Sequence, residues 1–260
     1  MASFVRRIKL EHDDFPIFIP SKGRPECKTA EILESEGIAF KIIIEPQEIE
    51  MYKKWGAKNI LILKENNMGI AYTRNFVMEY TKIRSISWCW IFDDDLASFW
   101  KTISGKNVKC KAREAISYAE SKLKKSKKIA QASFEYQQYA WSMDGKPRVN
   151  SYNDCFVAFD TAKMREKGIK WDESFKLKSD RDVSIQILKN GYNNVRFTNY
   201  SFSCPENGSN EGGLHFEYQK KSVERLSCFD LERKWGSDIV EVKIKPSGRV
   251  DAKIKWNKIK

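Results

Sequence analysis

The stretch ISWCWIFDDD, residues 86–95, decides the fold and locates the candidate site. Its first part, Ile86 to Phe92, has the length and the aromatic and apolar content of a buried β-strand. Three aspartates, Asp93, Asp94 and Asp95, follow immediately. Open α/β sheets bind ligands outside the carboxyl ends of their strands, so the triplet lies where a ligand site is expected.

The chain before this stretch alternates strand-like and helix-like segments. Apolar runs predict strands over residues 15–20, 40–44 and 60–63. Helical spacing predicts helices over residues 27–36, 47–55 and 70–81, the first ending at Gly37. Repeated βα units of this kind predict an α/β fold with a doubly wound, mostly parallel sheet.

The pattern loosens after the triplet, where shorter strands are expected over residues 130–139 and 155–159. Residues 239–256 alternate apolar side chains with charged ones on either side of Pro246-Ser247-Gly248, which predicts a β-hairpin with one lysine-bearing face. We therefore expect one domain over residues 1–260, with a parallel α/β half over 1–100 and an α+β half over 101–260 that ends in the hairpin.

Composition excludes several classes of protein. The chain has 260 residues, 41% of them hydrophobic, and a net charge of +12, so the positive charge belongs to a folded protein. No apolar stretch reaches the roughly 18 residues that span a membrane, and the first residues lack the apolar core of a signal peptide. Six scattered cysteines without CxxC pairs are typical of reduced thiols. We expect a cytoplasmic protein, with a monomer favoured.

The aspartate triplet indicates a metal site, because three adjacent carboxylates repel one another unless something neutralises them. Mn²⁺ or Mg²⁺ would do so, and Mg²⁺ is usually held by one or two carboxylates together with substrate phosphates. The alternative is a solvated acidic loop.

A second candidate lies at the start of the helix expected over residues 70–81. Gly69 precedes that helix and Arg74 falls in its following turn, a geometry suited to a diphosphate near a helix N-terminus. The alternative for Arg74 is an ordinary surface arginine.

Taken together, these motifs resemble the GT-A fold of nucleotide-sugar glycosyltransferases over most of the chain. The resemblance implies that the first strand and its loop hold the nucleoside and that an acidic residue after the second strand contacts the base. Asp93-Asp94-Asp95 matches the family's DxD motif, in which the last aspartate, here Asp95, binds the metal. The implied donor-binding residues are Pro20, Ser21, Arg24, Glu45, Gly69, Arg74, Asn75, Asp93 and Asp94.

The second half adds two further matches. The segment Ser179-Asp180-Arg181-Asp182 resembles the Glu-Asp motif that places a carboxylate beside the acceptor, although serine replaces the usual glutamate. It implies Asp180 and Asp182 as catalytic carboxylates; the alternative for Asp180 is a helix cap. His215, which follows a glycine-rich stretch, matches the histidine that completes the metal site, while a lone histidine is more often structural.

The closest resemblance is to phage-type glycosyltransferases of DNA hypermodification, some of them encoded near base-oxidising dioxygenases. It rests on Ile19 to Pro25, on Gly69 to Asn75 and on the aspartate triplet. It implies a cytoplasmic enzyme, in the host cytoplasm if a phage encodes it.

The charge distribution bears on the acceptor. Residues 101–128 hold ten Lys and Arg against two Glu. Such a segment, shortly after the metal motif, would hold duplex DNA without reading its sequence, whereas the alternative is a solvated helix face. The candidate DNA contacts are Lys106, Lys109, Lys111, Lys124 and Lys125.

We therefore predict a metal-dependent glycosyltransferase that moves a sugar from a nucleoside diphosphate, with UDP favoured, onto 5-hydroxymethylcytosine or a related pyrimidine in double-stranded DNA. Asp180 would act as the base if the enzyme inverts, and the sequence leaves the stereochemistry open. Three alternatives remain: a GT-A enzyme with a glycan or protein acceptor, a nucleotidyltransferase, and a DNA-binding protein without catalysis.

Overall fold

The computed structural model describes residues 15–142, 145–206, 208–246 and 248–259. Its first half is built from βα units, as the sequence predicts. Strands β1 (Ile17–Pro20), β2 (Phe40–Ile44), β3 (Ile60–Ile62) and β4 (Trp88–Phe92) alternate with helices α1 (Lys28–Ser35), α2 (Ile49–Trp55) and α3 (Ile70–Ile83). The strands are short and apolar, and Ile42, Ile43 and Ile44 of β2 are buried. These four strands pair in parallel, in the order β3-β2-β1-β4.

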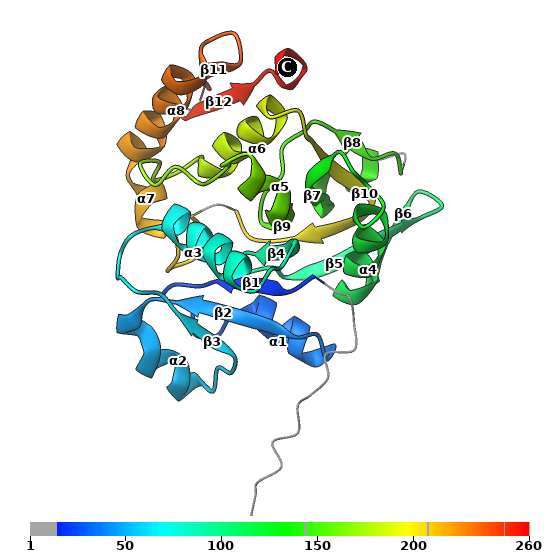
Figure 1. The fold of residues 1–260 in the computed structure, drawn as a ribbon, viewed down its shortest axis with the longest axis vertical. Helices are drawn as coiled ribbons and strands as arrows, with labels where there is room; N and C mark the ends of the chain where they lie inside the picture. The colour runs from blue at the N-terminus through cyan, green and yellow to red at the C-terminus, as the bar shows by residue number, and fades with distance from the viewer. Residues whose placement is uncertain (1–14, 143–144, 207, 247, 260) are drawn as a thin grey trace, which may run out of the picture.

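The second half continues the same sheet with mixed pairing (Figure 1). Its strands are β5 (Ser98–Ile103), β6 (Lys106–Cys110), β7 (Ile129–Tyr136), β8 (Arg148–Val149), β9 (Phe156–Asp160) and β10 (Asn193–Ser203). Beyond β4 the order is β9-β7-β10-β5-β6, and β9 is antiparallel to both β4 and β7. The predicted α/β class, with an α+β second half, is confirmed. The sequence analysis missed β5, β6, β8 and β10 as separate strands.

Helices cover both faces of the sheet. One face packs against α1 and α4 (Ala112–Leu123), and its core contains Trp90, Phe134 and Phe156. The other packs against α3, α5 (Thr161–Glu166) and α6 (Ser179–Lys189) through Val77, Met164 and Val183. The result is a three-layer α/β arrangement around a 10-stranded sheet.

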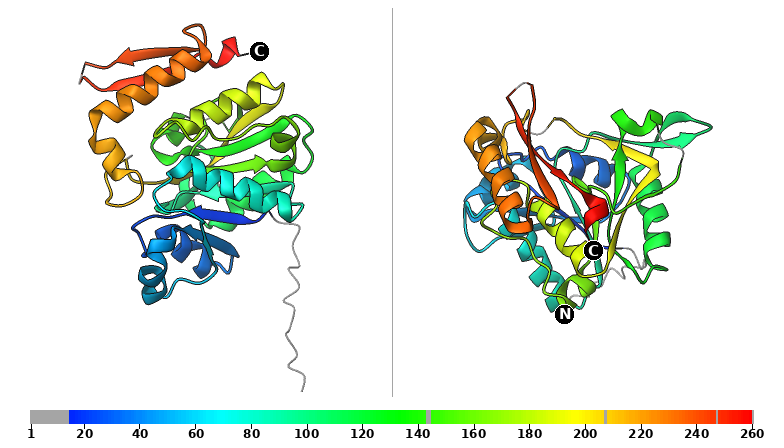
Figure 2. Two further views of the ribbon diagram at one scale, coloured as in Figure 1. Left: turned by 60° about the vertical axis from the view of Figure 1, so that its left-hand side comes forward. Right: turned by 90° about the horizontal axis from the view of Figure 1, so that it is seen from above.

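The C-terminal part forms a separate small layer. The short helix α7 (His215–Gln219) leads into α8 (Lys221–Trp235), which is followed by β11 (Val240–Ile244) and β12 (Val250–Ile254). The predicted hairpin is confirmed, with Ser247 of its turn outside the described residues. Cys228 and Leu231 of α8 pack on Val240 and Ala252 of the hairpin, and Ile185 of α6 joins this core. Figure 2 shows α8 and the hairpin lying together along one side of the molecule.

All six cysteines are free thiols. Over the part of the chain that the structure describes, no helix combines the length and apolar character needed to cross a bilayer.

Candidate active site

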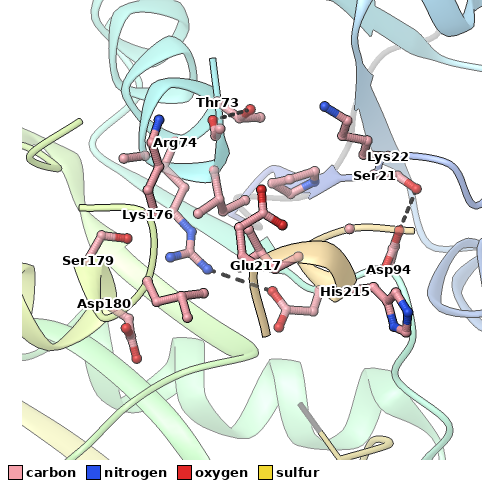
Figure 3. Close-up of a pocket in the computed structure, with 18 of the residues that line it drawn as sticks. Ser21, Lys22, Thr73, Arg74, Asp94, Lys176, Ser179, Asp180, His215 and Glu217 are labelled. Atoms are coloured by element: carbon pink, nitrogen blue, oxygen red, sulfur yellow. Dashed lines mark hydrogen bonds and ion pairs between the residues drawn. The ribbon is translucent and has the colours of Figure 1, made fainter. Parts of the chain in front are cut away.

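A pocket of about 330 Å³ opens at the carboxyl ends of β1, β2 and β4, where the sequence places the polar clusters (Figure 3). One wall comes from the parallel half and includes Ser21, Glu45, Arg74 and the aspartate triplet. The opposite wall comes from segments 152–155, 173–180, 204–206 and 208–218. The two halves of the fold therefore meet at this pocket.

Arg24 connects the aspartate triplet to the opposite wall. Its guanidinium donates to Asp94 Oδ1 at 2.7 Å and to Asp95 Oδ2 at 3.0 Å. The same group donates to the backbone carbonyl of Glu211 at 2.7 Å. Asp94 also accepts from Ser21 Oγ at 2.6 Å, and burial raises the pKa of Asp94 while Arg24 opposes that rise. The motif that the sequence analysis assigned to donor binding is thus held by one arginine and one serine.

The glycine-rich stretch is required for this arrangement. Gly213 N donates to Lys22 O at 2.8 Å, which brings two loops together. Gly212 has a φ of +82°, and a Cβ at this position would lie 2.6 Å from Lys22 O. Any other residue there would separate the loops, because this distance is well inside van der Waals contact.

Asp93 lies beside Arg74 on the same wall of the pocket. The Arg74 guanidinium lies 3.8 Å from Asp93 Oδ1. The Asp93 side chain is 37% exposed within the pocket, and desolvation by the pocket walls raises its pKa to about 7 although Arg74 favours the charged form. Arg24 and Arg74 therefore offset part of the negative charge of the triplet.

Glu45 is buried at the end of β2 and accepts from Lys22 Nζ at 2.9 Å and from Gln47 Nε2 at 2.7 Å. Lys22 Nζ also donates to Asn67 Oδ1 at 2.7 Å. Pro20, at the end of β1, lines the pocket beside them. The predicted nucleoside-binding residues of β1 and β2 are thus brought to one wall.

Helix α3 begins at the pocket, as predicted. Gly69 is its N-cap, with a φ of 89°, and Thr73 and Arg74 line the pocket. Asn75 does not line it. Its side chain donates to Trp171 O at 2.9 Å and to Glu173 Oε1 at 2.7 Å, so Asn75 fastens α3 to the segment before α6.

Asp180 and Asp182 have different surroundings although both lie in the first turn of α6. Asp180 lines the pocket and accepts from the Tyr152 hydroxyl at 2.7 Å. The helix N-cap is Lys178, so the alternative that Asp180 caps the helix is wrong. Burial raises the pKa of Tyr152, which keeps this hydroxyl a hydrogen-bond donor.

Asp182 is a correction to the predicted pair of catalytic carboxylates. It is fully buried and lies outside the pocket. Its oxygens accept from Trp235 Nε1 at 2.8 Å, from Lys234 Nζ at 3.0 Å and from Gln186 Nε2 at 2.7 Å. Successive helical residues differ by about 100° in direction, so two residues in positions i and i+2 face nearly opposite sides. Asp182 therefore joins α6 to α8.

The proposed metal ligands Asp95 and His215 both line the pocket. His215 Nδ1 lies 2.9 Å from Gly208 O, a contact that assigns the proton to Nδ1 and leaves the Nε2 lone pair free for a ligand. Among the described residues, no group of three or more His, Cys, Asp and Glu side chains is arranged to hold a metal. Asp95 supplies the carboxylate oxygen that Mg²⁺ and Mn²⁺ prefer, and substrate phosphates and water would supply further ligands.

The lysines predicted to contact DNA lie elsewhere. Lys106 and Lys109 are on β6, Lys111 precedes α4, and Lys124 and Lys125 follow it. None of these five lines the pocket. Strand β6 is at the far edge of the sheet from β1 and β2, as Figure 1 also shows. Proximity in sequence to the triplet does not bring this segment to the pocket.

Several pocket residues had no sequence signal that we used. Tyr152 and Asp154 lie just before β9, and they reach the pocket only because β9 pairs with β4. Asp154 accepts from the Tyr136 hydroxyl, and burial raises its pKa. Further unpredicted residues of the pocket include Lys22, Cys155, Lys176, Cys204, Glu217 and Tyr218. The sequence carries one feature that could have indicated Asp154 as a site residue: it is a polar residue just before an apolar strand.

Comparison with solved structures shows which known fold this one is similar to. The fold is similar to residues 1–349 of S. aureus TarS, with a TM-score of 0.51, 13% identity, and coverage of 84% of this chain and 65% of that one. The same TarS fragment in complex with UDP-GlcNAc gives a TM-score of 0.52 at 11% identity, over 84% of this chain and 66% of that one. The chain thus spans just under two thirds of the TarS fragment, and identities this low show the fold alone.

The mixed sheet, with the acidic triplet beyond β4, is thus similar in fold to the TarS fragment. Residues 15–213 match the model of the TET-associated glycosyltransferase family, and the chain belongs to that family. No curated protein matches the sequence.

Proposed function

We propose that this glycosyltransferase transfers a sugar from a UDP-sugar to the hydroxyl of a 5-hydroxymethylated pyrimidine, 5-hydroxymethylcytosine in the first instance, in double-stranded DNA. Family membership over residues 15–213 carries the proposal, because the family is described by its association with TET, a base-oxidising dioxygenase. The likeness to a TarS fragment that holds UDP-GlcNAc supports a uridine diphosphate donor.

The donor wall of the pocket supports a nucleoside diphosphate. Arg74 and the N-terminus of α3 present positive charge and backbone N–H groups to the same space, which is favourable for a diphosphate. Lys22 and Glu45 offer a donor and an acceptor at the ends of β1 and β2 for the nucleoside. These groups would orient the donor and stabilise the charge that develops on the leaving diphosphate.

Asp95 and His215 would hold Mn²⁺ or Mg²⁺, with Asp93 beside them. A bound divalent ion would supply further positive charge to the departing diphosphate. Arg24 already pairs with Asp95, so one carboxylate oxygen of that side chain is engaged by the protein itself.

Asp180 would accept the proton of the acceptor hydroxyl if the transfer inverts the anomeric centre. The Tyr152 hydroxyl holds one of its oxygens, Oδ2, and thereby fixes the orientation of the carboxylate. A retaining transfer would not need this base.

The test combines the protein with Mn²⁺, a panel of nucleotide sugars and DNA with or without 5-hydroxymethylcytosine, followed by digestion and mass measurement of the nucleosides. We expect a sugar adduct only on the modified nucleoside. Hydrolysis of the donor without any adduct on DNA would contradict the proposal that DNA is the acceptor. It would remain consistent with a glycosyltransferase. Release of pyrophosphate from a nucleoside triphosphate would indicate a nucleotidyltransferase instead.

Three variants test the residues. Asp95→Asn should lower transfer by about 100-fold or more, as should Asp180→Asn if the enzyme inverts. Asp230→Asn is the matched control, because Asp230 is a partly exposed carboxylate on α8 that pairs with Arg233. Unchanged transfer in Asp95→Asn would contradict the metal proposal. The anomeric configuration of the product would show whether the transfer inverts and therefore needs Asp180 as a base.

A further inference from the structure

Exposed apolar side chains lie on α7, which lines the pocket, and on α8, which follows it directly. Phe216 is 71% exposed, Leu226 is 61% exposed and Phe229 is 40% exposed. Exposed large apolar groups that gather on one face of a protein mark interaction surfaces more often than single ones do. Together with Lys220, Lys221 and Arg225 they form what we call the rim surface.

Phe216 lies directly at the mouth of the pocket. Its neighbours Leu214, His215, Glu217 and Tyr218 all line the pocket, whereas Phe216 itself points to solvent. Its ring centroid is 5.6 Å from that of His215, with the two rings at 79°. Figure 3 shows His215 and Glu217 directed into the pocket from this short helix. A planar group that contacts Phe216 would therefore lie next to the catalytic space.

The cations of the rim surface are not neutralised by the protein. Lys220, Lys221 and Arg225 are exposed, and across residues 15–142, 145–206, 208–246 and 248–259 none of them forms an ion pair. Arg225 lies 5.7 Å from the ring centroid of Phe229. The surface therefore combines unpaired positive charge with aromatic rings.

The acidic residues of the same helices do not cancel this charge. Glu224 is buried and pairs with Lys178 and Arg249, each at 3.0 Å. Asp230 pairs with Arg233, Glu232 accepts from Val242 N at 3.0 Å, and Glu217 points into the pocket. On the same wall of the pocket, Lys176 is exposed and forms no ion pair among the described residues.

Cations beside a protruding aromatic ring match the chemistry of a nucleic acid, which offers phosphates and unstacked base faces. We propose that the rim surface binds the acceptor DNA, with Lys220, Lys221 and Arg225 on its phosphates and the Phe216 ring stacked on a base next to the modified nucleotide. This inference rests on the proposed function. It places the DNA at the pocket mouth, and the lysines of residues 101–128 outside the interface.

The geometry gives a reason for the stacking contact. The hydroxymethyl group of the acceptor nucleotide must reach Asp180 and the donor diphosphate within the pocket. Enzymes that act on a nucleobase commonly extrude that nucleobase from the stack. Extrusion leaves a gap beside the neighbouring base, which an apolar ring at the mouth of the pocket can fill. Phe216 is the aromatic residue of the rim in that position.

The experiment compares wild type with Phe216→Ala, with the triple variant Lys220→Gln, Lys221→Gln and Arg225→Gln, and with a charge-matched control, Lys106→Gln, Lys109→Gln and Lys125→Gln. The probe is a fluorescent duplex of about 20 base pairs with one 5-hydroxymethylcytosine, its affinity measured by anisotropy over a series of salt concentrations. UDP affinity and thermal melting report whether each variant folds.

Loss of Phe216 should weaken duplex binding by about 5-fold to 150-fold, the range for a base-stacking aromatic, and Phe216→Trp should restore it. The rim triple variant should lower the slope of log affinity against log salt by about 2 to 3, because each phosphate contact contributes about 0.9. The control triple and the UDP affinity should stay at the wild-type value.

The inference would be overturned if the rim triple variant kept the wild-type slope of log affinity against log salt while the control triple variant lowered it. That result would indicate a DNA interface on residues 101–128. Duplex affinity at the wild-type value in Phe216→Ala would contradict the proposed stacking of Phe216 on a base. If the wild type binds DNA through the rim surface but adds no sugar to it, the proposed function fails and the interface stands. If the wild type binds no DNA at all, both fail.

Discussion

At the scale of single residues, Arg24 is the central group of the site. It donates to Asp94 and Asp95, and also to the backbone carbonyls of Asn210, Glu211 and Gly212. Its side chain is only 15% exposed. One guanidinium thus neutralises part of the triplet and holds the glycine-rich loop, a double role that its planar set of donors makes achievable.

Replacing Arg24 with Gln should lower the free energy of unfolding by about 3 kcal/mol, because it leaves Asp94 buried without its cation. Urea unfolding measures the loss. Adding Asp94→Asn to Arg24→Gln should recover part of it, because the unpaired charge is then removed. A double variant less stable than Arg24→Gln alone would contradict this explanation.

The two arginines also predict how the protein responds to chelation. Since Arg24 and Arg74 already offset charge on the triplet, EDTA should change the melting temperature of the donor-free protein by no more than about 2 °C. Mn²⁺ with UDP should raise it, because a ligand that binds only the folded state stabilises that state. Unfolding by EDTA alone would show a structural metal and refute the prediction.

At the scale of elements, α8 is joined to α6 and to the segment before it by a cluster of charges. Lys234 Nζ lies 2.8 Å from Asp172 Oδ2 and 3.0 Å from Asp182. Trp235 adds a hydrogen bond to Asp182. The cluster fixes α8, and through it the short helix α7 that carries His215.

The Asp172 contact gives a pH prediction. The hydrogen bond from Lys234 lowers the pKa of Asp172 to about 2 from its ordinary value of 3.8. A lowered carboxyl pKa contributes stability above the unfolded value, and that contribution is lost as the pH falls from about 4 to about 2. Because Asp172 is partly exposed, we expect Asp172→Asn to cost no more than about 1 kcal/mol at pH 7.

Urea unfolding of wild type and Asp172→Asn at pH 7 and at the lowest pH where both fold would measure this effect. The difference between the two proteins should shrink at the lower pH. Asp238→Asn, a change at an exposed aspartate between α8 and β11, controls for loss of surface charge. An undiminished difference at low pH would mean that packing, and not the charge of Asp172, accounts for it.

At the scale of the whole molecule, the pocket depends on parts that lie far apart in the chain. The parallel half supplies the donor wall, and β9, α6 and α7 supply the other. The C-terminal hairpin lies outside the large sheet, yet Val240 and Ala252 cover the buried face of α8. A two-stranded hairpin has little stability alone, so it and α8 should form one cooperative unit.

A charge in the hairpin core should therefore loosen the pocket rim. Ala252→Asp places a carboxylate against Cys228 and Leu231 of α8. Hydrogen exchange should accelerate in residues 215–235 and stay at the wild-type rate in β1 and β4. Lys253→Asp, on the exposed face of the same strand, is the matched control. Equal protection of α8 in both variants would show that the hairpin does not support it.

The sequence by itself determined the parallel half, the start of α3 at Gly69, the hairpin, and the position of the triplet beyond β4. These features are encoded locally, because an apolar run, a glycine before a helix and a polar residue at a strand end each lie within a few neighbouring residues. The parallel order of the strands then brings their carboxyl ends to one edge.

Only the tertiary structure decided which charged groups meet. It joined Arg24 to Asp94 and Asp95, directed Asp180 to the pocket and Asp182 to α8, and placed the lysine-rich segment at the far edge of the sheet. It also placed the exposed Phe216 on the short helix whose residues His215, Glu217 and Tyr218 line the pocket. The reason is physical: a salt bridge or an exposed surface depends on distances in space between residues far apart in the chain, and local patterns carry no measure of those distances.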